Sequence, residues 1–393
     1  MFKVFVAHSS DLDTRDAAVA VIKHLMSQLT TDSPVKAGLL FVGANHDASV
    51  LLNLINRTFP GIELIGCTAD GEMTSAGGYV EDSVSLTLFC SDTIDIRAGV
   101  GRDTSTDPAK SARQAVQQAL HNLTGEPVLA LTMPDGLSTM SYPMLNEMQL
   151  MLGNHVPIVG GASADQVLYS KLDYRTQQFF HDEVLSDATP VLLFSGPLLF
   201  ALGVQSGWTP LGIKKYVTAE NAGEVFDLEG MPPLKLYQYY LGESIADNRA
   251  MLGTFPLAVH EQDSDLFYLR VVSKLDAETG YMKFSGDVPN GSCVQLTRAM
   301  RHQVIQGVNK SVLDAMNRYP GEQPEIALTF SCTGRKMALG SKTYLEIERV
   351  MDLLGKKTKV SGFYTFGEIA PLTIPGQSHY HNATFVTLLL GTL

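Results

Sequence analysis

The stretch GLLFVGANHDASVLLNLINRTFPGIELIGCTADGE, residues 38–72, decides the fold of this chain. The apolar run at 38–42 predicts a strand, the apolar spacing of 48–57 predicts a helix, and 62–65 predicts a second strand. Because a helix of this length joins the two strands, we expect them to pair in parallel through a right-handed crossover. The unit closes with a glycine-rich, acidic turn at 66–72.

The same order of strand, helix, strand and glycine-rich turn recurs at 128–165 and at 326–368. Gly-x4-Gly-Glu occurs at 66–72 and again at 362–368, and its recurrence in matching context indicates an internal duplication. A further strand follows each unit after a loop. Two of these strands partly alternate, as antiparallel strands with one wetter face do. The three following strands are expected at 82–89, 189–195 and 382–390.

These patterns predict a mixed α/β protein whose duplicated βαβ units form two mixed sheets flanked by helices. The segment 266–294 predicts an extra β-meander in the second half of the chain, and a long helix is expected over 295–318. We divide the chain into an N-terminal domain, 1–215, and a C-terminal domain, 216–393. No low-complexity linker separates them, so the two domains are expected to pack together.

The composition is that of an acidic globular protein. The chain has 393 residues, 45% of them hydrophobic and 18% charged, and a formal net charge of −12. Nucleic acid and anionic membranes would meet net repulsion, so we expect neither as a partner. The longest apolar stretch, 191–204, is interrupted by Ser195, Gly196 and Pro197 and is too short to span a bilayer. The first residues lack a signal peptide's apolar region and cleavage site, which predicts a cytoplasmic location.

The sequence lacks the common signatures of catalytic and metal-binding proteins. The cysteines Cys67, Cys90, Cys293 and Cys332 lie far apart without a CxxC pair, so buried reduced thiols are expected. No P-loop, GxSxG, HExxH or EF-hand loop occurs in the sequence. These absences favour a binding protein over an enzyme.

Candidate ligand-binding residues follow the strand ends, where ligands bind in open α/β sheets. Arg335 offers a cationic fork for a carboxylate or phosphate, and Glu368 offers an anion for an ammonium group. Glycines at the same ends allow the backbone to approach a ligand closely. The structural alternative is a salt bridge between Arg335 and Glu368, with glycines that serve only turn geometry. The candidate set is Gly66, Gly71, Glu72, Cys332, Arg335, Gly362, Gly367 and Glu368.

Histidines at two places are candidate ligands of a metal or cofactor. His379 and His381 precede the last strand, and their i, i+2 spacing points both side chains the same way. His260 ends an apolar run at 255–259 and is a candidate axial ligand. The alternative for the first pair is a pair of exposed loop histidines, and the alternative for His260 is a histidine without a ligand.

The turns at 66–72, 160–165 and 362–368, together with Ser-Cys-Thr-Gly-Arg at 331–335 and His-Asn-Ala-Thr at 381–384, resemble the FIST family. FIST domains are sensory domains of bacteria and archaea. The resemblance covers nearly the whole chain and implies an N-terminal and a C-terminal FIST half. It further implies a sensor of small ligands such as amino acids.

A chain of two FIST halves without an output domain also resembles the nitric-oxide-sensing FIST hemoproteins. That resemblance implies non-covalent heme b, with His260 or His381 as the iron ligand. It also implies a partner histidine kinase that controls cyclic-di-GMP signalling and biofilm formation. CxxCH is absent, which excludes covalent heme attachment. One departure from the family pattern is Asp70, which adds a carboxylate to a turn usually built of small residues.

Three functions therefore stay open at this point. The first is a heme-based nitric oxide sensor. The second is a sensor of an amino acid or similar ligand bound between Arg335 and Glu368. The third is an enzyme that uses Cys332 as a nucleophile, with the thiol pKa lowered by the nearby Arg335. A homodimer is compatible with each.

Overall fold

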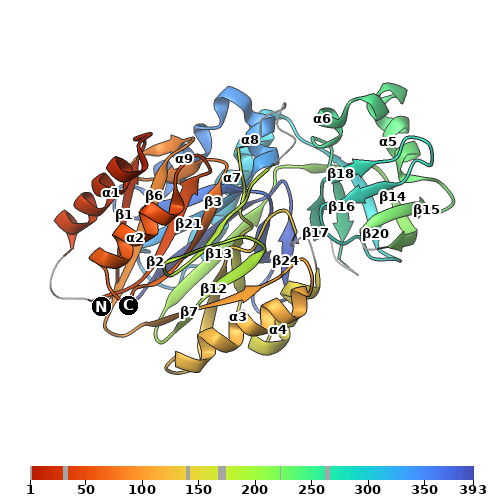
Figure 1. Ribbon diagram of the computed structural model, residues 1–393. Helices are drawn as coiled ribbons and strands as arrows, with labels where there is room; N and C mark the ends of the chain where they lie inside the picture. Colours follow the sequence, from red (N-terminus) through yellow and green to blue (C-terminus); the bar gives the residue numbers. More distant parts are fainter. Residues whose placement is uncertain (1, 30–33, 139–141, 167–173, 222, 262–265) are drawn as a thin grey trace.

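The computed structural model describes residues 2–29, 34–138, 142–166, 174–221, 223–261 and 266–393 (Figure 1). The described residues form three six-stranded sheets and one seven-stranded sheet. The three six-stranded sheets make up one large body. The seven-stranded sheet belongs to a smaller lobe that lies beside this body in Figure 1.

The first sheet confirms the crossover expected from residues 38–72. Strands β2 and β3 pair in parallel, and α2 (Ala48–Thr58) joins them. Strand β6 lies antiparallel between β1 and β2. The strands are β1 (Phe2–Ser9), β2 (Val35–Gly43), β3 (Glu63–Ala69) and β6 (Val84–Ser91).

The second and third sheets repeat this arrangement. In each, two parallel strands flank a helical crossover, and the next strand returns antiparallel between the first of them and an outer strand. The second sheet contains β7 (Asp95–Arg102), β8 (Pro127–Thr132), β9 (Ile158–Gly161) and β12 (Ala188–Ser195). The third contains β13 (Leu199–Gln205), β21 (Ile326–Cys332), β22 (Lys359–Thr365) and β25 (Phe385–Gly391).

Each sheet is completed by a hairpin from a different repeat. The hairpin after β9 joins the first sheet at β3, the hairpin after β22 joins the second at β9, and the hairpin after β3 joins the third at β22. The exchange is cyclic and gives the body an approximate threefold arrangement. The hairpins are β10 (Gln178–Phe180) with β11 (Glu183–Leu185), β23 (Glu368–Pro371) with β24 (Ser378–His381), and β4 (Glu72–Thr74) with β5 (Gly78–Val80). The α/β class with helix-flanked mixed sheets is confirmed, but the sheets of the duplicated units number three instead of two.

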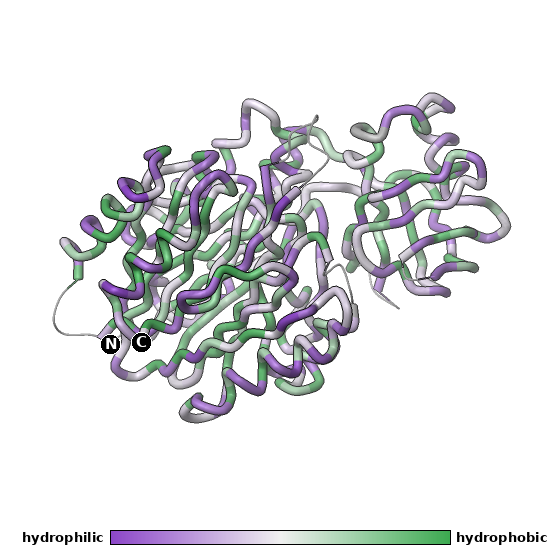
Figure 2. Tube along the Cα trace, in the orientation of Figure 1, coloured by the Kyte–Doolittle hydropathy of each residue, from purple (hydrophilic) through white to green (hydrophobic). Residues whose placement is uncertain are grey.

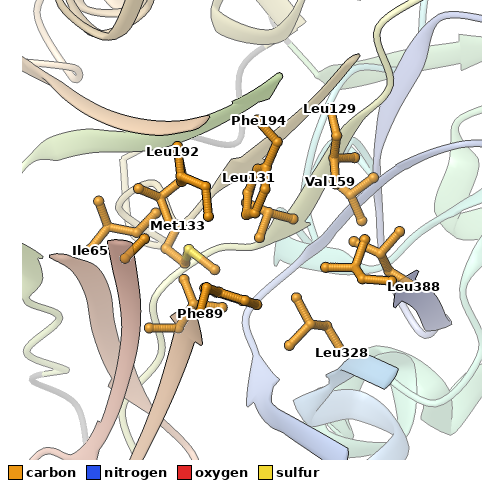
Figure 3. Packing of buried hydrophobic residues seen from close by; sticks show 14 of the residues in the cluster. Ile65, Phe89, Leu129, Leu131, Met133, Val159, Leu192, Phe194, Leu328 and Leu388 are labelled. Atoms are coloured by element: carbon orange, nitrogen blue, oxygen red, sulfur yellow. The ribbon is translucent and has the colours of Figure 1, made fainter. Parts of the chain in front are cut away.

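The inner faces of the three sheets share one hydrophobic core. Ile65 from the first sheet, Leu131 from the second and Leu328 from the third all belong to it (Figure 3). The outer faces are covered by pairs of helices that bury separate cores. Figure 2 shows hydrophobic colour along the strands and hydrophilic colour recurring on the helices. The remaining covering helices are α1 (Thr14–Gln28), α3 (Pro108–Asn122), α4 (Tyr142–Leu152), α7 (Arg301–Arg318) and α9 (Leu345–Leu354).

The smaller lobe is an insertion between β13 and α7, and we call it the inserted domain. Its core includes Val217, Tyr237 and Leu296. Its sheet has the order β17-β16-β20-β14-β15-β19-β18. Of the meander expected over 266–294, only the hairpin β18–β19 is present, because β17 pairs with β16 at the opposite end of the sheet. The strands are β14 (Thr209–Asn221), β15 (Glu224–Leu228), β16 (Leu257–His260), β17 (Phe267–Arg270), β18 (Val272–Leu275), β19 (Met282–Phe284) and β20 (Cys293–Arg298). The short helices are α5 (Pro233–Leu241), η1 (Glu243–Asp247) and α6 (Arg249–Leu252).

Two boundaries that the sequence predicted, one of a helix and one between domains, fall within the inserted domain. The helix expected over 295–318 begins at Arg301, because Val294 and Leu296 are buried in β20 between β14 and β16. The domain boundary predicted between residues 215 and 216 falls within β14. The division of the chain into an N-terminal and a C-terminal domain at this point stays a prediction. Among the described residues, no helix is long and apolar enough to cross a membrane.

Candidate functional site

The three glycine-rich turns meet at one end of the body. The N–H of Asp70 donates to the carbonyl of Tyr364 at 3.0 Å, and the N–H of Ala164 donates to the carbonyl of Thr68 at 2.9 Å. The N–H of Ala162 donates to the carbonyl of Gly367 at 2.8 Å. The turns expected to form a ligand crevice are therefore joined to one another by backbone hydrogen bonds.

The recurring spacing of glycines in the turns at 66–72 and 362–368 has a packing reason. A Cβ at Gly66 would lie 1.9 Å from the carbonyl oxygen of Leu40, and one at Gly362 would lie 2.0 Å from that of Thr329. Gly71 and Gly367 face the rings of Tyr79 and Tyr380 in the same way. These four candidate residues allow strands and hairpins to approach closely, which is a structural role rather than contact with a ligand.

The two glutamates after the glycines are buried and equivalent. Glu72 accepts a hydrogen bond from the Ser83 hydroxyl, and Glu368 accepts one from the Thr384 N–H at 3.0 Å. Their Oε1 atoms have no hydrogen-bond partner within the described part of the chain. Burial raises the pKa of Glu72 to about 8 and raises the pKa of Glu368 well above its usual value. Burial thus favours the neutral form of both carboxyls, which disfavours either as the anion expected for an ammonium ligand.

Arg335 is a structural residue in this geometry. Its side chain is fully buried, and it donates to Glu346 Oε1 from Nε at 3.0 Å and from Nη2 at 2.7 Å. It also donates to the carbonyl of Val304 at 2.8 Å. The ion pair expected between Arg335 and Glu368 is therefore an ion pair with Glu346, and the predicted crevice between Arg335 and Glu368 is not formed.

Helix α8 (Thr333–Leu339) and the turn η2 (Gly340–Lys342) follow β21, and Cys332 caps the start of α8. The N–H of Gly334 lies 3.4 Å from Cys332 Sγ. Burial, and then the neighbouring Glu368, raise the pKa of the Cys332 thiol far above its usual value, and the opposing effect of Arg335 is smaller. A neutral thiol is a poor nucleophile, so this environment disfavours the enzyme hypothesis.

A cavity lies between the inserted domain and the body, beside Cys332, and we call it the junction cavity. Its volume is about 190 Å³. The inserted domain contributes Gly253, Thr254, Val271 and Ser285, and the body contributes Cys332, Thr333, Gly334, Met337, Phe366 and Asn382. All of these lining residues are uncharged. Hydroxyl and amide groups alternate with apolar surface, which suits a small polar but neutral molecule.

Two hydrogen bonds tie the inserted domain to its surroundings at the junction cavity. The N–H of Val271 donates to Asn382 Oδ1 at 3.2 Å. The indole Nε1 of Trp208 donates to the carbonyl of Thr254 at 3.0 Å, and Trp208 is the single tryptophan of the chain. Sequence reasoning did not nominate Trp208, Thr254, Val271 or Ser285. No local sequence pattern shows which residues of an insertion will pack against a strand end that is far away in the sequence.

The side chains of the two candidate heme ligands, His260 and His381, both contact other groups of the protein. His381 is 1% exposed, and its Nε2 lies 2.9 Å from the carbonyl oxygen of Ala370. Burial lowers the pKa of His381 to about 3. His260 belongs to the inserted domain, and its Nε2 lies 3.2 Å from Gln295 Oε1. An iron bond at either Nε2 would require one of these contacts to break, so the two sites do not fit heme ligation as they stand.

No group of three or more histidine, cysteine, aspartate or glutamate side chains is arranged to hold a metal ion in the described ranges. Heme binding, nitric oxide sensing, the histidine kinase partner and the control of cyclic-di-GMP stay predictions from the resemblance. None of the contacts described above supports them.

Comparison with known families supports the resemblance that the repeated turns indicate. Residues 36–231 match the FIST N domain, and residues 233–371 match the FIST C domain. The chain therefore belongs to the FIST family of sensory domain proteins. No curated protein matches the chain.

Solved structures show only distant similarity. The chain is similar to the cyanuric acid hydrolase from A. caulinodans at a TM-score of 0.37 and 10% identity, covering 100% of this chain and 99% of that one. It is similar to T. maritima PurL complexed with FGAR at a TM-score of 0.24 and 11% identity, covering 100% of this chain and 72% of that one. Neither similarity is close enough to support an argument about function.

Proposed function

We propose that this FIST protein is a sensor of a small uncharged ligand that binds in the junction cavity. The observation that carries the proposal is the cavity itself, which lies between the inserted domain and the body and is lined by both. Its volume of about 190 Å³ is below the roughly 300–1,000 Å³ of pockets that hold drug-sized ligands. The ligand is therefore a small molecule rather than a peptide or a nucleotide.

The neutrality of the ligand follows from the charges around the cavity. The lining has no charged side chain among its described residues. Arg335 is paired with Glu346, and burial raises the pKa of the nearby Glu368 carboxyl, which favours its neutral form. A charged ligand would lose its hydration without gaining a partner, which is costly. An amino acid held between Arg335 and Glu368 is not compatible with this arrangement.

The position of the cavity supplies a mechanism for sensing. A ligand that contacts Thr254 and Ser285 on one side and Thr333 on the other stabilises the docked position of the inserted domain. Ligand binding shifts a conformational equilibrium only when it favours one arrangement over the other. The docked arrangement has the complete cavity, so it binds the ligand more tightly than an arrangement in which the inserted domain has moved.

The test compares neutral and charged molecules of matched shape by Trp208 fluorescence and thermal shift. Suitable pairs are nicotinamide with nicotinate and uracil with orotate. We expect a saturable response to at least one neutral member and none to its charged counterpart. Gly334→Leu places a side chain in the cavity wall and should abolish the response. Ser27→Leu, at an exposed position of α1 that does not line this cavity, is the matched control and should preserve it.

Two results would contradict the proposal. One is a response to charged members alone or to no member of the panel. The other is a response that Gly334→Leu leaves unchanged, because the ligand would then bind elsewhere.

A further inference from the structure

A second cavity lies on another side of α8, and we call it the acidic cavity. Its volume is about 360 Å³. Asp70, Tyr79 and Glu81 reach it from the first repeat, and Lys336 and Tyr344 reach it from the third. Met337 lines both this cavity and the junction cavity. The acidic cavity is thus formed where the hairpin of the first repeat has been exchanged into the third sheet.

The acidic cavity already holds a primary ammonium group, that of Lys336. Its Nζ lies 2.6 Å from Asp70 Oδ1, 3.1 Å from the Asp70 carbonyl oxygen and 2.9 Å from Glu81 Oε1. These three acceptors match the three hydrogens of an ammonium group. Asp70 is fully buried, whereas the Glu81 side chain is 52% exposed. One carboxylate is therefore closed to solvent, and the other is open to it.

Among the residues given above as lining the acidic cavity, two carboxylates, those of Asp70 and Glu81, face the one ammonium group of Lys336. The Tyr79 hydroxyl donates to Glu81 Oε1 at 2.6 Å and holds that carboxylate in place. Bonds from Tyr79 and Lys336 outweigh burial and lower the pKa of Glu81, so its charge is retained at neutral pH. Tyr344 adds an exposed aromatic ring to the lining, and such rings attract cations.

We propose that the acidic cavity is a second ligand site, which binds a small organic cation with an alkylammonium group. The ligand's ammonium group binds Glu81 in competition with Lys336, and Lys336 stays on the buried Asp70. The ligand's alkyl chain lies against Tyr344 and Met337. This site stands on its own observations and does not depend on the ligand proposed for the junction cavity.

Occupation of the acidic cavity is expected to act on α8. Gly334 lines the junction cavity, Lys336 lines the acidic cavity, and both residues belong to this one helix. When a ligand takes Glu81 from Lys336, α8 loses one of its ties to the first repeat. If the junction cavity binds a neutral ligand as proposed above, the two ligands alter each other's affinity by the same factor.

The test measures binding of n-butylammonium by calorimetry at constant ionic strength, with 1-butanol as the neutral counterpart. We expect saturable binding of n-butylammonium and none of 1-butanol. Glu81→Gln removes the open carboxylate and should weaken binding about tenfold or more, since a hydrogen bond to a charged group is lost. Glu243→Gln, which removes an exposed charge in the inserted domain, is the matched control and should leave binding unchanged.

A second variant separates ligand binding from a purely structural tie. Lys336→Met removes the competing ammonium and should strengthen n-butylammonium binding. If the cluster serves only to fix α8, Lys336→Met lowers stability without any gain in binding, and the proposal is overturned. Equal binding of 1-butanol, equal binding by Glu81→Gln or no saturable binding by the wild type would overturn it as well. The neutral-ligand titration of the junction cavity gives an independent result in each case.

Discussion

Asp70 and Phe366 occupy the same position in two repeats, and the chemistry around them is opposite. Each lies four residues after a glycine that a parallel strand requires, and each precedes the same Gly-Glu pair. Asp70 lines a cavity that contains two carboxylates and a lysine, whereas Phe366 lines one with uncharged walls. The repeat thus provides the location, and this position, one of four that differ between the two turns, contributes to the chemistry that we propose each cavity recognises.

The residues shared by the two turns serve the architecture. The first glycine of each admits a neighbouring carbonyl oxygen, and Glu72 and Glu368 are both buried with raised pKa values. Both cavities also depend on α8, which packs on the buried pair of Arg335 and Glu346. The most informative variants therefore either break this common framework or change one turn and not the other.

The largest effect is expected from Arg335→Met. It leaves Glu346 buried without its cation, which should cost about 3–5 kcal/mol of the free energy of unfolding. Urea denaturation measures this loss. Arg349→Met, at an exposed pair with Asp352, is the matched control and should change stability by less than about 1 kcal/mol. A loss at Arg335 as small as that at Arg349 would show that α8 is anchored by other contacts.

The pH dependence of stability tests the burial of Glu72. Its pKa is about 8 in the folded protein and about 4.5 when unfolded, so the folded state binds more protons between these values. Stability from this group therefore falls as pH rises from 4.5 to 8, by about 1.4 kcal/mol per unit at most. Glu72→Gln should remove this slope and be more stable than the wild type at pH 8.

His381 changes the pH dependence of stability in the direction opposite to that of Glu72, so the two contributions must be separated. Its pKa is about 3 when folded, below its ordinary value of 6.5, so its contribution rises with pH between these values. The difference between the wild type and Glu72→Gln, measured by urea denaturation from pH 5 to pH 8, cancels the histidine. A difference that does not change with pH would mean that Glu72 is charged in the folded protein.

The equivalence of the turns predicts matched losses for Gly66→Ala and Gly362→Ala. Each Cβ would fall within about 2 Å of a carbonyl oxygen, so each variant should lose about 1–3 kcal/mol or more. Gly334→Ala is the control, because its nearest neighbour would be a sulfur atom at 3.5 Å. Thermal unfolding compares the three. A tolerated alanine at one site and not the other would break the structural equivalence of the two repeats.

The smallest effect is expected from Tyr79→Phe, which alters only the lining of the acidic cavity. It removes one hydrogen bond to Glu81, which is worth about 0.5–1.5 kcal/mol. The pKa of Glu81 should rise, since that bond helps to hold it down. NMR titration of the Glu81 carboxyl carbon measures the change, and responses to neutral ligands of the junction cavity should be unaffected.

Local patterns were sufficient to predict the crossovers and their trailing strands. The apolar run at 38–42 and the helix spacing of 48–57 appear as β2 and α2, and the turns at 66–72 and 362–368 are equivalent. Three units were recognised, but two sheets were expected where the structure has three. The exchange of hairpins could not be predicted either, because each hairpin pairs with a strand of another repeat. Such pairing leaves no mark in the local periodicity.

Of the ligand-binding residues expected from the sequence, only Cys332 is among those that line the junction cavity. Cys332 lies at the junction cavity, as a strand-end location suggested. Arg335 and Glu368 were expected to face a ligand. Instead, Arg335 lies on α8 and donates to Glu346. Glu368 is buried at the start of the β23–β24 hairpin, where Gly367 packs against Tyr380. Thr254 and Ser285 reach the cavity from the inserted domain, about fifty to eighty residues away in sequence from Cys332.

The most direct test of two chemically distinct cavities is ligand-observed NMR on a mixture of the neutral panel and n-butylammonium. The mixture is applied to the wild type, Gly334→Leu and Glu81→Gln. We expect Gly334→Leu to remove the signals of neutral ligands alone and Glu81→Gln to remove the signal of n-butylammonium alone. Loss of both classes in either variant, or competition of both classes for one site, would contradict it.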